Sequence, residues 1–324
     1  MLNFYQIARN TFRECLREPI FFILLASALI LIGLFPSMCL FVFREQMKLV
    51  VDSSMATTQV FGLMAAVLCA SHTVSREMRN GTVLLLMSKP VHRCSFIVAK
   101  ICGVSMALIV FVLVCNAASL ISLKIAKDQF QLNYSMMTIF FVLIFLAAAF
   151  GGLRNFQSQR SFSSNAIIAI LILIPVMALV CYLMPHGQHD EEAAFSMANL
   201  LKAQLLIFYS VCAMGVITVT LSTRLDMVPN LTVSAVIFFM GLLSGYFCNL
   251  DTGNVFINSL TGLLYLILPN WQFFWLADAL AENQNIPMAY ILWGTANVVF
   301  YMALCSIWAV VLFQNREMAR DVRQ

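Results

Sequence analysis

The residues best suited to contact another molecule lie in a polar segment between two apolar stretches. This segment, called the polar island below, runs from Ser75 to Arg93 and carries Glu77, Lys89 and Arg93. Side chains of this kind form ion pairs with opposite charges on a soluble protein, or with anionic lipid headgroups. A protein embedded in lipid receives a push from a soluble partner only through such polar surface. The island is therefore the first candidate for a functional site.

Other residues with suitable chemistry are few. His186, His189 and the acidic residues 190–192 carry ligand atoms for a divalent metal, but two histidines three apart in a solvated loop usually bind no ion tightly. No spacing supports a Ser-His-Asp, thiol-histidine or paired-carboxylate arrangement, so the sequence predicts no catalytic, cofactor-binding or metal-binding residue. The chain also lacks the Gly-x-x-x-x-Gly-Lys-Ser/Thr loop that binds ATP phosphates, so energy from ATP must come from a partner.

Polar side chains within apolar stretches form a second group of candidates. Asn116 and Asn297 each lie well inside such a stretch, where an unpaired amide is costly. Contact between helices and contact with a transported substrate both fit this position. The ten cysteines mostly occur singly along apolar stretches and are interpreted as small apolar residues, although Cys39 and Cys248 could pair near one face.

The composition places these residues in an integral membrane protein. Of the 324 residues, 61% are hydrophobic and only 10% are charged, whereas a soluble domain has about 25% charged residues. About 20 apolar residues span the hydrocarbon core, and eight stretches of suitable length and composition occur. They are residues 20–42, 57–74, 96–123, 136–153, 166–184, 205–221, 231–250 and 287–313.

Two further segments are predicted to lie at the membrane surface. Residues 1–18 interleave Arg9, Arg13 and Arg17 with apolar side chains, which is typical of an amphipathic interfacial helix or of a basic flank that orients the first span. Residues 255–280 are apolar but interrupted at Pro269, so they are interpreted as a re-entrant or interfacial pair. The predicted fold is all-α, with residues 19–324 forming a single transmembrane domain.

The basic residues indicate the orientation of this domain. Eight spans place both termini on one side, and most of the 19 Lys and Arg residues then lie on that side, as the positive-inside rule requires of cytoplasmic loops. The polar island, the second inner loop around Arg224 and both termini are therefore expected in the cytoplasm. The net charge of +4 reflects this topology, and no nucleic-acid partner is expected.

The island has the features of a short rigid connection. Asn80, Gly81 and Thr82 favour a turn whose threonine can cap the next helix, residues 83–87 form a short apolar run, and Ser88, Lys89 and Pro90 end it. The next span then starts with Arg93 and Lys100 at its base. A short helix held between two spans is a suitable element for transmitting a push.

The island resembles the coupling segment of ABC-2 type transporter permeases. The similarity rests on Glu77, Gly81, Thr82, Leu86, Ser88, Lys89, Pro90, Arg93, Phe96, Lys100 and Gly103. It favours the branch that includes the permeases of nitrous-oxide-reductase maturation and gliding motility. Residues 221–225, 268–270, 278–280 and 314–318 also resemble this family, whereas residues 136–184 resemble an inserted helical pair because members usually have six spans.

The resemblance implies a permease subunit, with the segment 75–100 as the coupling element. Its expected partners are two cytoplasmic ABC ATPase subunits, a second permease copy or paralogue, and membrane lipids, in a bacterial inner membrane. The implied coupling residues are Glu77, Gly81, Thr82, Ser88, Lys89, Pro90, Arg93 and Lys100, with Ser222, Arg224 and Asp226 in the second inner loop.

Two classes of function remain open at this level. An exporter or force-transmitting ABC complex would use the island for docking. An ATPase-independent secondary carrier or a membrane scaffold would use its basic residues only to orient the spans. A carrier requires coupling carboxylates at mid-membrane, and the predicted spans contain essentially none. The sequence identifies no substrate.

Overall fold

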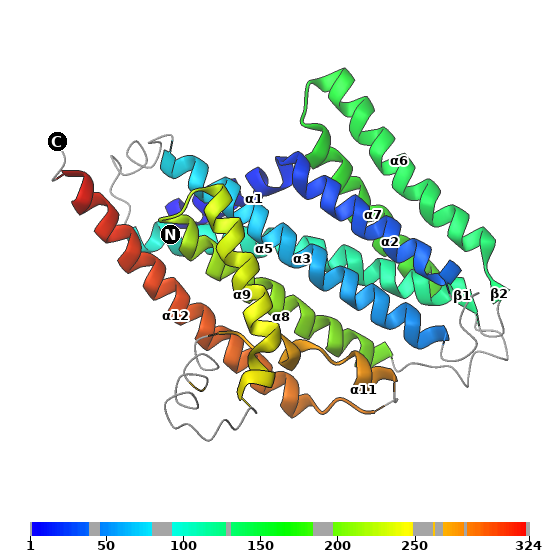
Figure 1. Ribbon diagram of the computed structural model, residues 1–324. Helices are drawn as coiled ribbons and strands as arrows, with labels where there is room; N and C mark the ends of the chain where they lie inside the picture. Colours follow the sequence, from blue (N-terminus) through cyan, green and yellow to red (C-terminus); the bar gives the residue numbers. More distant parts are fainter. Residues whose placement is uncertain are drawn as a thin grey trace.

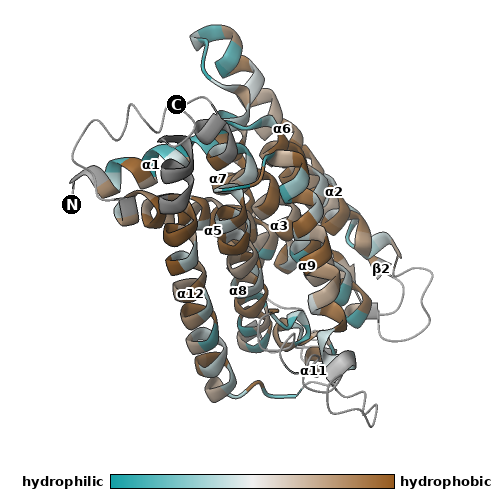
Figure 2. Cartoon of the chain, turned by 60° about the vertical axis from the view of Figure 1, so that its left-hand side comes forward, coloured by the Kyte–Doolittle hydropathy of each residue, from teal (hydrophilic) through white to brown (hydrophobic). Residues whose placement is uncertain are grey.

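The computed structural model is a bundle of long helices (Figure 1). It describes residues 2–38, 46–79, 93–127, 131–183, 197–248, 262, 268–281 and 284–321. Helix α1 and the last turns of α12 lie at the same end of this bundle (Figures 1 and 2), and that end is called the terminal end below.

Eight helices of the described part are long and apolar enough to cross a membrane, which confirms the predicted all-α polytopic fold. Each predicted stretch coincides with one of them. They are α2 (Pro19–Met38), α3 (Gln46–Arg79), α5 (Arg93–Ile125), α6 (Tyr134–Ser158), α7 (Phe162–Leu183), α8 (Met197–Ser222), α9 (Met227–Cys248) and α12 (Met288–Asp321).

The largest difference from the sequence prediction is the start of α3. The helix begins at Gln46, before the predicted stretch 57–74, because its first turns contain Asp52 and several hydroxyl residues that lower the hydropathy. The hydroxyls of Ser54 and Thr58 donate to backbone carbonyls one turn earlier, at 2.9 and 2.8 Å, and both residues are buried. Such local bonds satisfy hydroxyl groups inside a helix, so the helix continues through a polar stretch.

Helices α3, α5 and α8 form the centre of the bundle, whereas α6, α9 and α12 lie at its periphery with mostly exposed side chains. Glycines allow the central helices to approach closely. A Cβ atom at Gly62 of α3 would lie 2.8 Å from Val211 of α8, and one at Gly215 of α8 would lie 2.9 Å from Leu108 of α5. In membranes such close backbone approach replaces the hydrophobic effect as a source of packing energy.

One central contact compensates for a proline. Pro36 lies inside α2 and has no N–H to donate to the carbonyl of Ile32, four residues earlier. The hydroxyl of Ser122, on α5, donates to that carbonyl at 2.9 Å, in a fully buried position. The side chain of one span thus completes the backbone hydrogen bonding of another.

Helix α1 (Leu2–Arg17) lies within the predicted interfacial segment and runs across the spans at the terminal end (Figure 2). Its Ala8, Thr11 and Cys15 are buried, and the backbone of Ala8 is so close to α5 that a Cβ atom at Gly103 would lie 2.6 Å from the Ala8 carbonyl oxygen. One face of α1 is therefore packed on the bundle.

Small elements occupy the opposite end. Two short strands, β1 (Ala126–Lys127) and β2 (Gln131–Leu132), pair antiparallel after α5. Residues 255–261 and 263–267 of the predicted re-entrant segment 255–280 lie outside the described residues. Its final part contains a 3₁₀ turn, η2 (Trp271–Phe274), and the helix α11 (Ala277–Ala281). The Trp271 ring is fully buried, and its indole nitrogen lies so close to Gly241 of α9 that a Cβ atom there would overlap it.

The predicted inserted pair corresponds to α6 and α7, which pack antiparallel (Figure 1). The two helices approach closely at Gly151, where a Cβ atom would lie 2.8 Å from that of Ala166. Phe22 of α2 also makes an edge-to-face contact with Phe162 of α7, with ring centroids 5.1 Å apart. The pair is thus packed against the rest of the domain.

Candidate coupling site

In the sequence the polar island runs from the last turns of α3 to the first residue of α5, and these two helix ends lie at the terminal end of the bundle (Figure 1). Helix α3 ends at Arg79 and α5 begins at Arg93. The side chains of residues 75–93 lie outside the described part of the chain. This set contains the predicted coupling residues Glu77, Gly81, Thr82, Ser88, Lys89, Pro90 and Arg93, whose roles remain predictions.

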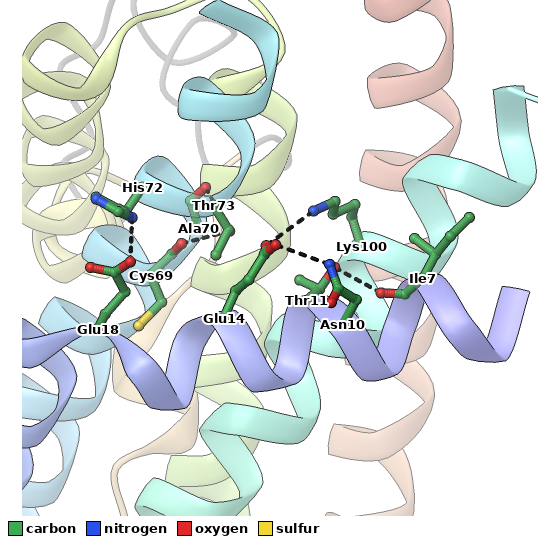
Figure 3. Close-up of polar contacts among 10 residues, drawn as sticks. All are labelled: Ile7, Asn10, Thr11, Glu14, Glu18, Cys69, Ala70, His72, Thr73 and Lys100. Carbon is green, nitrogen blue, oxygen red and sulfur yellow. Dashed lines mark hydrogen bonds and ion pairs between the residues drawn. The ribbon is translucent and has the colours of Figure 1, made fainter. Parts of the chain in front are cut away.

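Lys100 is the one predicted coupling residue whose side chain is described. It lies on α5, about two helical turns after Arg93, and its side chain is only 3% exposed. The ammonium nitrogen lies 3.7 Å from Oε2 of Glu14, on α1, and 5.9 Å from the centre of the Phe96 ring (Figure 3). Lys100 thus contacts α1 from inside the protein instead of facing solvent.

Glu14 is itself held in place on α1. Asn10, one turn earlier, donates a hydrogen bond from Nδ2 to Oε1 of Glu14 at 3.0 Å (Figure 3). The two carboxylate oxygens therefore have different partners, one on α1 and one on α5. The side chain is 37% exposed, so water still solvates part of the charge.

A second polar contact joins the residue after α1 to α3. Glu18 follows directly after α1, and its Oε1 lies 3.0 Å from Nδ1 of His72, on α3 (Figure 3). His72 lies about two turns before the end of α3. The α1 segment therefore contacts both helices that flank the island, through His72 on α3 and Lys100 on α5.

The second inner loop is very short and joins α8 to α9. The structure separates its three predicted residues: Ser222 is fully buried, whereas Arg224 and Asp226 are exposed. The hydroxyl of Ser222 donates to the Thr218 carbonyl at 2.7 Å. Arg224 and Asp226 are therefore available at the surface, and Ser222 belongs to the interior.

Asn230, in the first turn of α9, joins this loop to α3. Its Nδ2 lies 2.7 Å from the hydroxyl oxygens of both Ser71 and Ser222, and the residue is fully buried. Ser71 precedes His72 on α3, so consecutive residues of one helix contact α9 and the α1 segment. The second inner loop and the base of the polar island are therefore connected through one buried amide.

The two intramembrane asparagines are in different environments. Asn116 of α5 has a buried Oδ1 without a hydrogen-bond partner among the described residues, whereas Asn297 is exposed on the outer face of α12. Their role as substrate contacts remains a prediction. Residues 186–192, whose side chains carry possible metal-ligand atoms, lie outside the described residues. Cys39 also lies outside them, and the side chain of Cys248 is not described.

Sequence reasoning missed the partners of this site: Glu14, Glu18, His72, Ser71 and Asn230. One signal was present, since Glu14 and Glu18 lie four residues apart and thus on one face of a helical segment. His72 and Asn230 were also polar residues within or beside apolar stretches, where a polar group requires a partner. The identity of each partner depends on tertiary packing, which sequence spacing alone does not supply.

The fold and this site define a polytopic α-helical membrane protein whose terminal end carries a polar connection between two spans. The model of the family described as ABC-2 family transporter protein matches residues 5–158, just under half of the chain. The matched region includes α1, α2, α3, α5, α6 and the polar island, and it supports a permease of the ABC transporter class. No curated protein matches the chain.

Proposed function

We propose that this chain is the membrane subunit of an ABC-2 type transporter and that the polar island receives movement from a separate cytoplasmic ATPase. The observation that carries the proposal is the attachment of α1 to both flanks of the island, through Glu14 to Lys100 and through Glu18 to His72. The family match extends over the same elements. A displacement of the island then moves α3, α5 and α1 together.

The second inner loop is part of the same proposal. A movement of α3 also reaches α8 and α9, because Asn230 contacts Ser71 on one side and Ser222 on the other. Arg224 and Asp226 are exposed at the surface of this loop. A partner that binds the island and the loop together would therefore act on four spans.

An assembly with two ATPase subunits and a second permease copy follows from the family resemblance, as do export and a location in a bacterial inner membrane with cytoplasmic termini. The branch resemblance to the nitrous-oxide-reductase maturation and gliding-motility permeases rests on residues 77–103 of the sequence. Substrate transport and force transmission without a cargo are both consistent with this assembly.

One observation bears on the alternative of an ion-coupled carrier. Because α3 begins earlier than expected, the carboxylate of Asp52 is on a membrane-spanning helix, with a buried Oδ1. Asp52 is, however, in the second turn of this helix, about 13 Å from the middle of the span at 1.5 Å per residue. It is therefore near the edge of the ~30 Å hydrocarbon core, which disfavours a mid-membrane coupling role.

Copurification tests the proposed function directly. The full chain is coexpressed with a candidate ABC ATPase from the same source, and ATPase retention is measured after affinity purification in mild detergent. Glu77→Lys and Gly81→Val, within the island, are expected to abolish retention. Tyr134→Ala is the control. Tyr134 is 67% exposed and is the first residue of α6, at the end of the bundle opposite the island. Full retention by both island variants would show that the ATPase binds outside the island, and no retention by the unaltered chain would support a carrier or scaffold instead.

A further inference from the structure

The end of α6 projects beyond its neighbours at the terminal end of the bundle. Gly151 of α6 is buried against α7, and a Cβ atom on the next residue, Gly152, would have no neighbour within 4 Å. Every residue from Leu153 to Arg160 is exposed. The last turns of α6 therefore stand clear of the bundle (Figures 1 and 2).

The apolar surface of α6 continues onto this projection. Phe145 and Phe150 are exposed along the span, and Leu153 and Phe156 continue the exposed side at helical spacing. Phe156 is 86% exposed. Phe145 and Phe150 face lipid, because α6 is a peripheral span. Leu153 and Phe156 continue the same apolar surface, which indicates that the projection also lies against lipid.

The length of α6 places the projection at the level of the headgroups. The hydrocarbon core requires about 20 helical residues. Counted from Tyr134, the first residue of α6, such a span ends near Leu153. The remaining turn, with Arg154, Phe156 and the following Arg160, then falls in the interfacial layer, where aromatic and basic side chains are favoured.

The projection, residues 153–160, carries only positive charge. Arg154 and Arg160 are basic, and the sequence has no acidic residue between Asp128 and Asp190. The guanidinium of Arg154 lies 5.7 Å from the centre of the Phe150 ring, so this charge is directed back along the helix towards the apolar surface. Arginine in this position suits a lipid phosphate next to the acyl chains.

We propose that the end of α6, residues 153–160, is a binding site for anionic phospholipid headgroups. Arg154 and Arg160 bind the phosphate, and Leu153 and Phe156 enter the adjacent acyl-chain layer. The site anchors the α6–α7 pair in the leaflet that adjoins α1 and the polar island. This inference does not depend on the proposed function, because it rests on the exposure, length and charge of α6.

Photocrosslinking in lipid nanodiscs identifies the occupant. The full-length protein carries Phe156→p-benzoylphenylalanine and is reconstituted either in phosphatidylcholine alone or in phosphatidylcholine with phosphatidylglycerol. Mass spectrometry after irradiation is expected to show lipid adducts enriched in phosphatidylglycerol. The combined variant R154Q/R160Q is expected to lower the phosphatidylglycerol adduct about tenfold, since each basic residue near an anionic surface strengthens binding, and to leave the phosphatidylcholine adduct unchanged.

Two controls make the result decisive. The same probe at Phe145, in the middle of α6, should form lipid adducts that do not depend on the headgroup or on the two arginines. Arg224→Gln removes another exposed arginine and should leave the Phe156 adducts unchanged. Equal labelling by both lipids, unchanged phosphatidylglycerol labelling in R154Q/R160Q, or an adduct with a protein in native membranes would each overturn the proposal.

Discussion

At the scale of single residues, Lys100 shows how a charge is retained inside the protein. Its ammonium group is almost completely removed from solvent and is balanced by Glu14, which remains partly hydrated. A buried charge that loses one partner costs more than the intact pair contributes, because the remaining charge is still desolvated. The Glu14 carboxylate therefore stabilises α1 on α5 mainly by compensating Lys100.

Removal of Glu14 tests this interpretation. Glu14→Gln should lower the free energy of unfolding by about 1–2 kcal/mol, between the values for exposed and buried pairs. The double variant E14Q/K100M should recover most of this loss, since no buried charge is left. Denaturant titration in mixed micelles measures both effects. If K100M brought no recovery in the E14Q background, the stabilising role of Glu14 would not be the compensation of Lys100.

At the scale of elements, α1 is positioned by a close approach that requires glycine. A Cβ atom at Gly103 would meet the Ala8 carbonyl oxygen at 2.6 Å and Cβ of Thr11 at 2.7 Å. Both atoms belong to, or lie close to, the α1 backbone, so a side-chain rotation cannot relieve the first contact. The separation of α1 from α5 therefore depends on this one residue.

Gly103→Val is expected to displace α1 from the bundle. Amide hydrogen exchange of residues 2–17 should accelerate by at least about tenfold, because local opening then costs less free energy. Retention of the ATPase should fall in the same variant if α1 holds the flanks of the island in place. Gly152→Ala is the control, since that site has free space and alanine favours a helix. Unchanged exchange in α1 of the Gly103→Val protein would contradict the packing described.

The elements were largely predictable, and their partners were not. All eight spans follow from apolar length, which is a local property of the sequence. The start of α3 was misplaced because buried hydroxyls such as that of Ser54 are satisfied by their own helix, yet lower the hydropathy of its first turns. Asn230 was a visible polar residue, yet its contact with Ser71 joins α9 to a helix 159 residues earlier in the chain, which no local pattern indicates.

At the scale of the whole molecule, the side of the membrane that holds the terminal end decides between the two classes of function. The excess of Lys and Arg in its loops predicts that the terminal end lies in the cytoplasm.

Cysteine labelling with a membrane-impermeant maleimide tests this orientation in a background with Cys94→Ser, which removes an exposed native thiol. Gly81→Cys should stay unlabelled in intact cells and become labelled after permeabilisation. Lys127→Cys, in the strand β1 at the opposite end, should be labelled in both. Labelling of the Gly81 site from outside would exclude coupling to a cytoplasmic ATPase.

The proline of α2 has a consequence for how the chain is assembled. Without an amide hydrogen from Pro36, the Ile32 carbonyl receives, within the described residues, an interhelical donor from Ser122, which is synthesised 90 residues later. Until α5 enters the bilayer, this oxygen must keep a water molecule or a temporary donor from the insertion machinery. The hydrogen bonding of α2, the first span, is therefore completed only after α5, the third span, has inserted, so the two helices are expected to reach their final structure together.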